Sequence, residues 1–258
     1  TFSVNRETLF NESIVIDSMS SLMKIITLIG GFLVLVISST YLKTFKIYNI
    51  EYPVLILSSI LGMMVMISSN DLIVFYMGLE LQSLALYVLA TYNRDQLKSS
   101  EAGLKYFVLS ALSSGLLLYG CSLVYGFSGS TNFDIISNQL NSEEYVLTFG
   151  IVFILVGLAF KISAVPFHMW APDVYEGSPT TVTLFFTIVP KVAALTVFIR
   201  FLYVPFLNLI DQWQMIIVFL SIASMIFGAV AAIGQTNIKR LIAYSSIGHI
   251  GYTLAGLA

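Results

Sequence analysis

The sequence predicts an all-α membrane protein, a polytopic helix bundle with about eight transmembrane helices. Of its 258 residues, 57% are hydrophobic and 10% are charged, whereas a soluble domain carries about 25% charged residues. The apolar segments are about 20 residues long, which is the length that crosses a bilayer as a helix. They do not alternate between polar and apolar residues, so a membrane β-barrel is excluded.

The membrane segments are predicted to form a single domain, residues 22–258. Residues 1–21 mix polar and apolar side chains and lack the pattern of a signal peptide. The single cysteine, Cys121, excludes an internal disulfide. Eight spans are predicted within the domain: 22–42, 53–69, 71–92, 102–127, 146–165, 180–204, 213–234 and 238–258.

Residues that favour helix starts support several of these boundaries. Asp71 follows Asn70 in a tight turn, and its carboxylate suits the N-cap of the third span. Glu143 and Glu144 precede the fifth span, where the helix dipole favours anions. Pro179 stands near the first helical position of the sixth span. Each of these residues therefore fits a helix that begins where the apolar run begins.

Four ionisable residues lie inside, or at the broken end of, the apolar segments: Glu80, Lys161, Lys191 and His249. A charge at the centre of a bilayer costs about 2.5–3.5 kcal/mol on insertion scales. Residues of this cost, spaced over successive helices, indicate a pathway for protons or ions. We expect the carboxylate of Glu80, near the middle of its span, to pair with a lysine on another helix. A protonated carboxyl that is hydrogen-bonded between helices is the alternative.

Lys161 lies in the stretch FKISAVPFHMWAPDVYEGSP, five residues before Pro166. Proline lacks an amide proton, and its ring clashes with the carbonyl four residues earlier. The helix is therefore predicted to break just beyond Lys161. Broken helices at membrane depth line cavities or lie inside protein, which suits a lysine that carries protons. A lysine that extends to the membrane interface is the alternative.

Lys191 follows Pro190 directly, near the middle of the sixth span. From this depth its side chain does not easily reach the interface. Burial favours the neutral amine, and a nearby carboxylate favours the ammonium ion. A buried lysine next to a carboxylate therefore releases a proton when the carboxylate moves away. A fixed structural ion pair is the alternative.

His249 lies centrally in the last span. Histidine titrates near neutral pH and has two distinct nitrogens, so it suits a proton relay. A hydrogen-bonded structural histidine is the alternative. Lys105, one turn inside the fourth span, is a fifth candidate for the pathway. Whether Asp173 or Glu176, in the loop after the predicted break, takes part is left open by the sequence.

No motif for a cofactor or a metal ion is present in the sequence. CxxC, P-loop, GxGxxG and HExxH patterns are absent, and His168 and His249 are the only histidines. A haem bundle usually needs paired histidine ligands. No basic cluster indicates a nucleic-acid partner. We therefore expect no cofactor, metal or nucleic acid on this chain.

Three stretches resemble the antiporter-like subunits of respiratory complex I, NADH:ubiquinone oxidoreductase. They are ELQSLALYVLA around Glu80, the stretch around Lys161 quoted above, and QTNIKRLIAYSSIGHIGY around His249. The last two most resemble subunit 2, and the resemblance runs from about Asp17 to the end. The many Ile, Phe, Ser, Asn and Tyr residues favour the mitochondrial form and its inner membrane, with a bacterial plasma membrane as the alternative.

The resemblance implies a proton-translocating subunit of the complex's membrane arm. The enzyme as a whole would be an NADH:ubiquinone reductase, with flavin, iron–sulfur clusters and quinone in partner subunits and no redox chemistry in this chain. The resemblance also implies a Glu80–Lys161 pair and a buried polar axis that continues through Lys191 and His249. Expected partners are the other membrane-arm subunits and membrane lipid.

The family pattern has about fourteen helices in two inverted repeats, each with a broken helix. The eight helices predicted here would match the third to the tenth. The first two and last four helices, and a further lysine, are therefore expected to be missing, and a separate polypeptide that supplies them is one explanation.

Two other functions stay open at this point. A subunit of a multisubunit cation/proton antiporter shares the acid–lysine pairs and needs no redox partner. A segment of the membrane arm that is structural and does not pump protons is the third hypothesis. Retention of four costly intramembrane residues argues against this third hypothesis.

Overall fold

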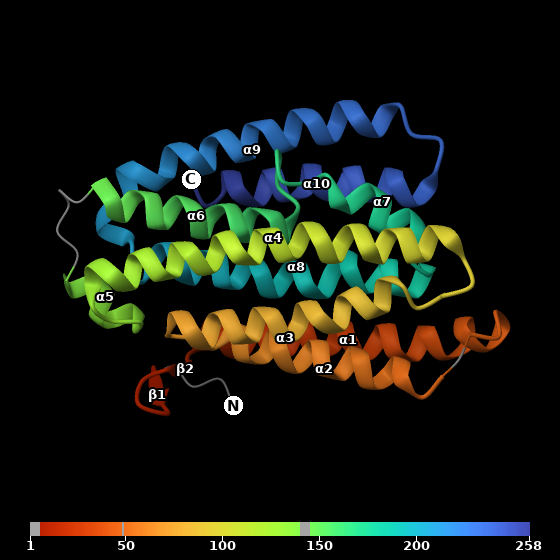
Figure 1. Ribbon diagram of the computed structural model, residues 1–258, viewed down its shortest axis with the longest axis horizontal. Coiled ribbons are helices and arrows are strands. Elements are labelled where there is room, and N and C mark those ends of the chain that lie inside the picture. Colours follow the sequence, from red (N-terminus) through yellow and green to blue (C-terminus); the bar gives the residue numbers. More distant parts are fainter. Residues whose placement is uncertain (1–5, 48, 140–144) are drawn as a thin grey trace. The chain divides into compact units, whose positions relative to one another are not determined.

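The computed structural model describes residues 6–47, 49–139 and 145–258, and these ranges are mostly helical (Figure 1). They contain ten α-helices, one short 3₁₀ helix and a two-stranded hairpin. The described residues pack into two compact units. The first extends to Val108 and includes Asp173–Thr196, and the second comprises Leu109–Pro172 and Val197–Ala258.

The first unit is built around three consecutive helices, α1 (Ser18–Thr44), α2 (Glu51–Ile67) and α3 (Leu72–Ala90). These helices lie side by side at the red and orange end of the chain (Figure 1). The carboxylate of Asp71 accepts hydrogen bonds from the amides of Ile73 and Val74, at 2.8 and 3.2 Å. The predicted N-cap of α3 is therefore confirmed.

A β-hairpin precedes α1, and the sequence did not predict it. Its strands β1 (Glu7–Leu9) and β2 (Ile14–Ile16) are antiparallel. The amide of Val15 donates to the carbonyl of Ser68 at 2.8 Å, so the hairpin is fixed to the turn between α2 and α3. Part of the mixed polar and apolar segment 1–21 is thus ordered against the first unit.

The second unit contains α5 (Phe133–Gln139), α6 (Tyr145–Ile162), η1 (Leu207–Leu209), α9 (Ile210–Ile233) and α10 (Ile238–Ala255). Its helices α9 and α10, blue in Figure 1, pack closely. A Cβ atom added to Gly228 would lie 2.6 Å from the amide nitrogen of Gly248, so only glycine permits this approach. Three helices run from one unit into the other: α4 (Leu97–Ser128), α7 (Trp170–Gly177) and α8 (Thr180–Tyr203).

Each of the eight predicted spans is a helix in the structure. Among the described residues, α1, α3, α4, α8 and α9 are long and apolar enough to cross a membrane, whereas α2 and α6 are shorter apolar helices. Helix α4 begins at Leu97, ahead of the predicted start at 102, and α5 and α7 are short helices that were expected to be loops. The predicted helix-start residues Glu143 and Glu144 lie outside the described residues.

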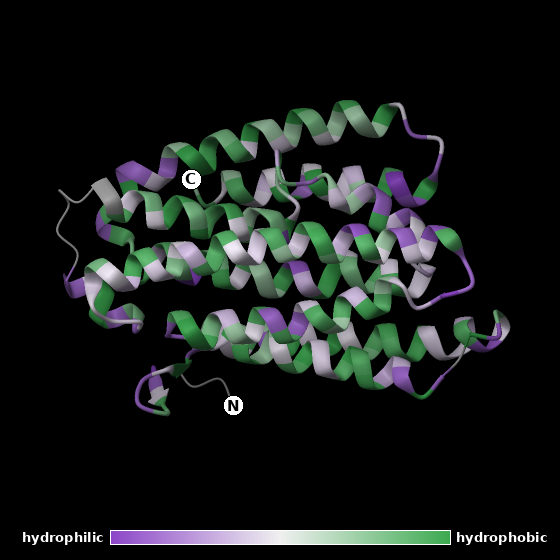
Figure 2. Cartoon of the chain, in the orientation of Figure 1, coloured by the Kyte–Doolittle hydropathy of each residue, from purple (hydrophilic) through white to green (hydrophobic). Residues whose placement is uncertain are grey.

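The helices expose large apolar side chains, as expected of a multi-pass membrane protein. Hydrophobic residues, green in Figure 2, make up much of the helices. On α1, Phe32 is 65% exposed, and on α9 Val230 is 67% exposed. Water does not favour such continuous apolar faces, whereas lipid does.

Candidate functional site

Helix α6 ends just after Lys161, as the sequence predicts. Ile162 is its last residue, and Ser163 adopts a left-handed backbone conformation with φ of 59°. The amides of Ser163 and Ala164 donate to the carbonyls three and five residues earlier, at 3.0 and 2.9 Å. This pattern is a Schellman motif. The helix is therefore closed by its own hydrogen bonds before the chain reaches Pro166.

Side chains from elsewhere in the second unit satisfy the backbone groups at this break. The indole nitrogen of Trp170 donates to the carbonyl of Phe160 at 2.9 Å. The amide of Val165 donates to the hydroxyl of Ser224, on α9, at 2.9 Å. Unsatisfied backbone groups are costly at membrane depth, so these bonds allow the irregular chain to persist there.

Lys161 is buried at this break and reaches toward α4. Its side chain is 7% exposed, and its ammonium nitrogen donates to the hydroxyl of Ser110 at 2.7 Å. The alternative in which the lysine extends to the interface does not fit this position. A buried amine that is hydrogen-bonded to a hydroxyl can hold or release a proton with little movement of either helix.

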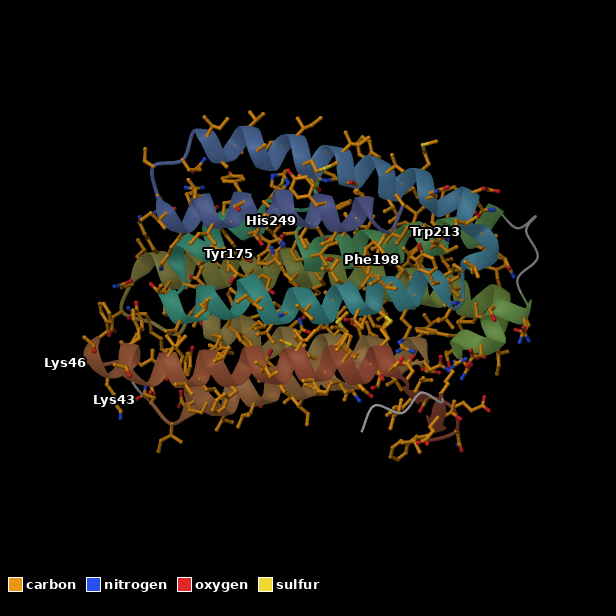
Figure 3. The ribbon with its side chains drawn as sticks, turned by 180° about the vertical axis from the view of Figure 1, so that it is seen from behind. Lys43, Lys46, Tyr175, Phe198, Trp213 and His249 are labelled. Atoms are coloured by element: carbon orange, nitrogen blue, oxygen red, sulfur yellow. The ribbon has the colours of Figure 1, made fainter. Side chains whose placement is uncertain are left out.

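Lys191 is also buried, at 5% exposure, and it lies in the continuous helix α8. Its ammonium nitrogen lies 5.6 Å from the centre of the Tyr175 ring, which is contributed by α7 (Figure 3). This geometry is that of a cation–π contact. The structure thus places an aromatic ring against the second predicted lysine.

Glu80 lies on α3, next to a very close approach of α2 and α3. A Cβ atom on Gly62 would lie 2.5 Å from the amide nitrogen of Gln82, and one on Gly78 would lie 2.8 Å from that of Met66. Glu80 is partly buried, and its Oε1 atom is buried without a hydrogen-bond partner in the described structure. A buried oxygen of this kind calls for a proton or a charged partner.

The predicted Glu80–Lys161 pair stays a prediction. Glu80 belongs to the first compact unit and Lys161 to the second. The same division separates Lys191, in the first unit, from His249, in the second. The structure therefore brings each lysine together with a partner from its own unit, Ser110 or Tyr175, and does not test the axis as a whole.

His249 is exposed in the described structure, whereas the resemblance implies a buried axis through it, and its role in the pathway stays a prediction. Its side chain is exposed on α10, near Tyr252 at 6.1 Å between ring centres (Figure 3). The buried face of α10 carries Ile247, Ile250 and Leu254. His249 lies on the opposite face because a helix turns by about 100° per residue.

Lys105 is exposed near the start of α4, in a group of ion pairs. Its ammonium nitrogen lies 2.9 Å from Asp173 and 2.7 Å from Glu101, and Lys98 lies 3.0 Å from Glu176. The pairs connect α4 with α7, the helix that follows the break. Exposed ion pairs stabilise a fold only slightly, so their effect here is mainly to orient α7. The role of Lys105 in the pathway stays a prediction.

Sequence reasoning missed Ser110 and Tyr175, two side chains that contact the buried lysines. Neither residue type stands out in a membrane helix. The one available signal for Tyr175 was Pro190, which leaves a backbone carbonyl of α8 without its helical donor. The described residues contain no group of three or more His, Cys, Asp or Glu side chains that would hold a metal ion.

A multi-pass bundle with a broken helix and buried lysines defines an antiporter-like membrane protein. The family model for NADH:quinone oxidoreductase/Mrp antiporter, TM, matches residues 69–258. The chain therefore belongs to this family. It is 81% identical over 251 residues to NADH-quinone oxidoreductase subunit N of Pelagibacter ubique, and 60% identical over 245 residues to the protein of that name from Rhodospirillum rubrum.

These alignments cover 97% and 94% of the chain but 53% and 50% of the relatives, so the chain spans about half the length of the curated relatives it matches. A structure of respiratory complex I from Thermus thermophilus with bound aureothin contains a chain of 32% identity and TM-score 0.82, matched over 98% of this chain and 53% of that one. The Mrp complex from Dietzia sp. DQ12-45-1b, at 24% identity, TM-score 0.80, and 95% and 45% coverage, shows the same fold. The two curated relatives are bacterial, so the predicted mitochondrial origin has no support here.

Proposed function

We propose that the chain is part of a proton-translocating, antiporter-like subunit in the membrane arm of a bacterial NADH-quinone oxidoreductase. The observation that carries this proposal is Lys161, a buried amine at a hydrogen-bonded break in a membrane helix. Burial of a lysine in a membrane segment is costly in free energy, so its presence there indicates a function. The 81% identity to subunit N of Pelagibacter ubique supports the assignment to the oxidoreductase.

In the proposed mechanism, Lys161 holds a proton against Ser110 while Glu80, its expected partner, is ionised. Two unit charges about 4 Å apart interact by about 4 kcal/mol at an intermediate dielectric, which corresponds to about three powers of ten in a proton equilibrium. When the charge of Glu80 is withdrawn or neutralised, Lys161 releases its proton. The proton then passes through Lys191 toward His249.

The proposal assigns the redox chemistry to other subunits. Flavin, iron–sulfur clusters and quinone would be bound there, and the chain would contact the other membrane-arm subunits and membrane lipid. We place the protein in the bacterial plasma membrane because the curated relatives named above are bacterial. The exposed face of α10 that carries His249 suits contact with further protein, whether from the same polypeptide or a separate one.

Native electrophoresis of mildly solubilised membranes, with peptide mass analysis of the band that contains this chain, tests the assignment. We expect co-migration with flavin and iron–sulfur subunits in a very large assembly. A small assembly without redox subunits would contradict the proposal. Deletion of a gene for a redox subunit provides the control, since it should shift this chain out of the large band.

A cation/proton antiporter subunit is the second candidate function. The family description names both oxidoreductases and Mrp antiporters, and the Mrp complex shares the fold. This candidate predicts sodium-dependent proton exchange that continues when quinone reduction is blocked. A structural, non-pumping segment predicts instead an unchanged proton-to-electron ratio when Glu80, Lys161, Lys191 and His249 are all replaced.

A further inference from the structure

Pro190 lies inside α8, and the helix continues through it. Because proline has no amide proton, the carbonyl of Phe186, four residues earlier, lacks its usual helical donor. The hydroxyl of Tyr175 donates to this carbonyl at 3.2 Å. All three residues belong to the first compact unit. A side chain of α7 thus replaces the hydrogen bond that the proline removes from α8.

Tyr175 is fixed to α8 at a second point. Its backbone carbonyl accepts a hydrogen bond from the hydroxyl of Thr183 at 3.0 Å. The Tyr175 side chain is fully buried, and its ring packs against Phe186 at 6.4 Å between ring centres. The backbone bond fixes the residue, and the ring cannot turn away without breaking the buried hydrogen bond of its hydroxyl, which is costly to leave unmade.

The fixed ring lies against the ammonium group of Lys191, 5.6 Å from its centre. Lys191 directly follows Pro190 in the sequence. Pro190 leaves the Phe186 carbonyl available to the Tyr175 hydroxyl, and Lys191 contacts the Tyr175 ring. The negative face of an aromatic ring attracts a cation, most strongly where water is excluded. The hydroxyl donates to the carbonyl of Phe186, and the ring of the same side chain contacts the lysine.

We propose that Tyr175 is a positioning residue for Lys191, anchored by the carbonyl that Pro190 leaves without a helical donor. Its ring holds the lysine side chain in place through a cation–π contact. The proposal rests on the proposed function, in which Lys191 carries a proton. It adds an aromatic partner that retains the proton on Lys191 until the next transfer.

The test measures the proton-to-electron ratio and the electron-transfer rate in membrane vesicles that contain the assembled oxidoreductase. We expect Tyr175→Leu to lower the ratio to the level of Lys191→Ala, while electron transfer persists. Tyr175→Phe keeps the ring, so its ratio should stay closer to the parent than to the leucine variant. A role in packing alone would lower assembly and electron transfer together with the ratio in the leucine variant, whereas a positioning role lowers the ratio alone.

The outcomes separate this inference from the proposed function. If Lys191→Ala lowers the ratio but Tyr175→Leu does not, the role of Tyr175 is overturned and the proton pathway stands. If Lys191→Ala itself leaves the ratio unchanged, the part of the pathway that runs through Lys191 fails and the role of Tyr175 fails with it.

Pro190→Ala tests the anchor even if the leucine variant does not assemble. Alanine restores an amide that competes for the Phe186 carbonyl, so the Tyr175 hydroxyl loses its acceptor. We expect Pro190→Ala to lower the ratio about as much as Tyr175→Phe. A variant that carries both Pro190→Ala and Tyr175→Phe should lower the ratio no more than the stronger of the two single variants. Both changes break the same hydrogen bond, from the Tyr175 hydroxyl to the Phe186 carbonyl. Additive losses would overturn the proposed anchor.

Discussion

Pro166 lies five residues after Lys161, and Pro190 lies directly before Lys191. The two prolines have different effects on their helices. Helix α6 ends before Pro166, and Lys161 is its penultimate residue. Helix α8 continues through Pro190, and Lys191 lies in its interior. The comparison shows that a proline alone does not decide whether a membrane helix breaks. The decision depends on which other groups satisfy the backbone around it.

At the first proline the chain uses its own backbone. The left-handed residue Ser163 closes α6, and the side chains of Trp170 and Ser224 satisfy backbone groups at the break. At the second proline one tyrosine hydroxyl donates to the carbonyl that the proline leaves without its helical donor, and the helix continues. The lysines differ accordingly: Lys161 has a hydroxyl as acceptor, whereas Lys191 faces an aromatic ring.

Ser110→Ala tests the hydroxyl partner of Lys161, and among the variants that probe this comparison it should reduce proton pumping most. Hydrogen bonds to a charged group contribute about 1.5–3 kcal/mol, so loss of the Ser110 acceptor should destabilise the protonated Lys161 by about this amount and lower proton pumping. Proton pumping per electron in vesicles measures this. Ser113→Ala is the matched control, because the Ser113 hydroxyl donates to the Gly157 carbonyl on α6 at 3.4 Å. Equal losses in both variants would contradict a specific role for Ser110.

Trp170→Phe should destabilise the break. The substitution keeps an aromatic ring but leaves the buried Phe160 carbonyl without its indole donor, at a cost of about 1–3 kcal/mol. Unfolding in detergent with increasing denaturant measures the loss. Trp213→Phe is the control, since the Trp213 indole donates to the Phe206 carbonyl away from the break. Both variants should lose stability, and only Trp170→Phe should also lower the proton-to-electron ratio.

The smallest expected effect is at Ser163, where the backbone has a positive φ. We expect Ser163→Gly to be more stable than Ser163→Ala by about 1 kcal/mol, because glycine adopts the left-handed conformation without a Cβ clash. Both variants lose the hydroxyl, so their difference isolates the backbone. The same detergent unfolding experiment measures it. Equal stability of the two variants would mean that Ser163 carries no backbone strain.

The sequence was sufficient to predict the helices at the eight apolar spans and the break after Lys161. Apolar runs of membrane length reveal the helices, and Pro166 beside a lysine pointed to the break. The N-cap at Asp71 was predictable because capping depends on local geometry. The hairpin formed by β1 and β2 was not, since its strands are short and depend on the turn after α2 for their hydrogen bonds.

The contacts of the ionisable residues were less predictable than their positions. In a membrane protein apolar side chains cover both buried and lipid-facing surfaces, so the sequence pattern does not show which face of α10 is buried. His249 was therefore placed inside and lies on the exposed face. The contact of Tyr175 with Lys191 depends on how α7 folds back on α8, which no local pattern encodes.

The central claim is that Lys161, at the end of a broken membrane helix, carries a proton that is pumped. The most direct measurement is the proton-to-electron ratio of Lys161→Ala in vesicles that contain the assembled oxidoreductase. Lys43→Ala, an exposed lysine at the end of α1 (Figure 3), is the control. We predict loss of most pumping in Lys161→Ala, with the complex assembled and the control unchanged. Normal pumping by Lys161→Ala would contradict the account.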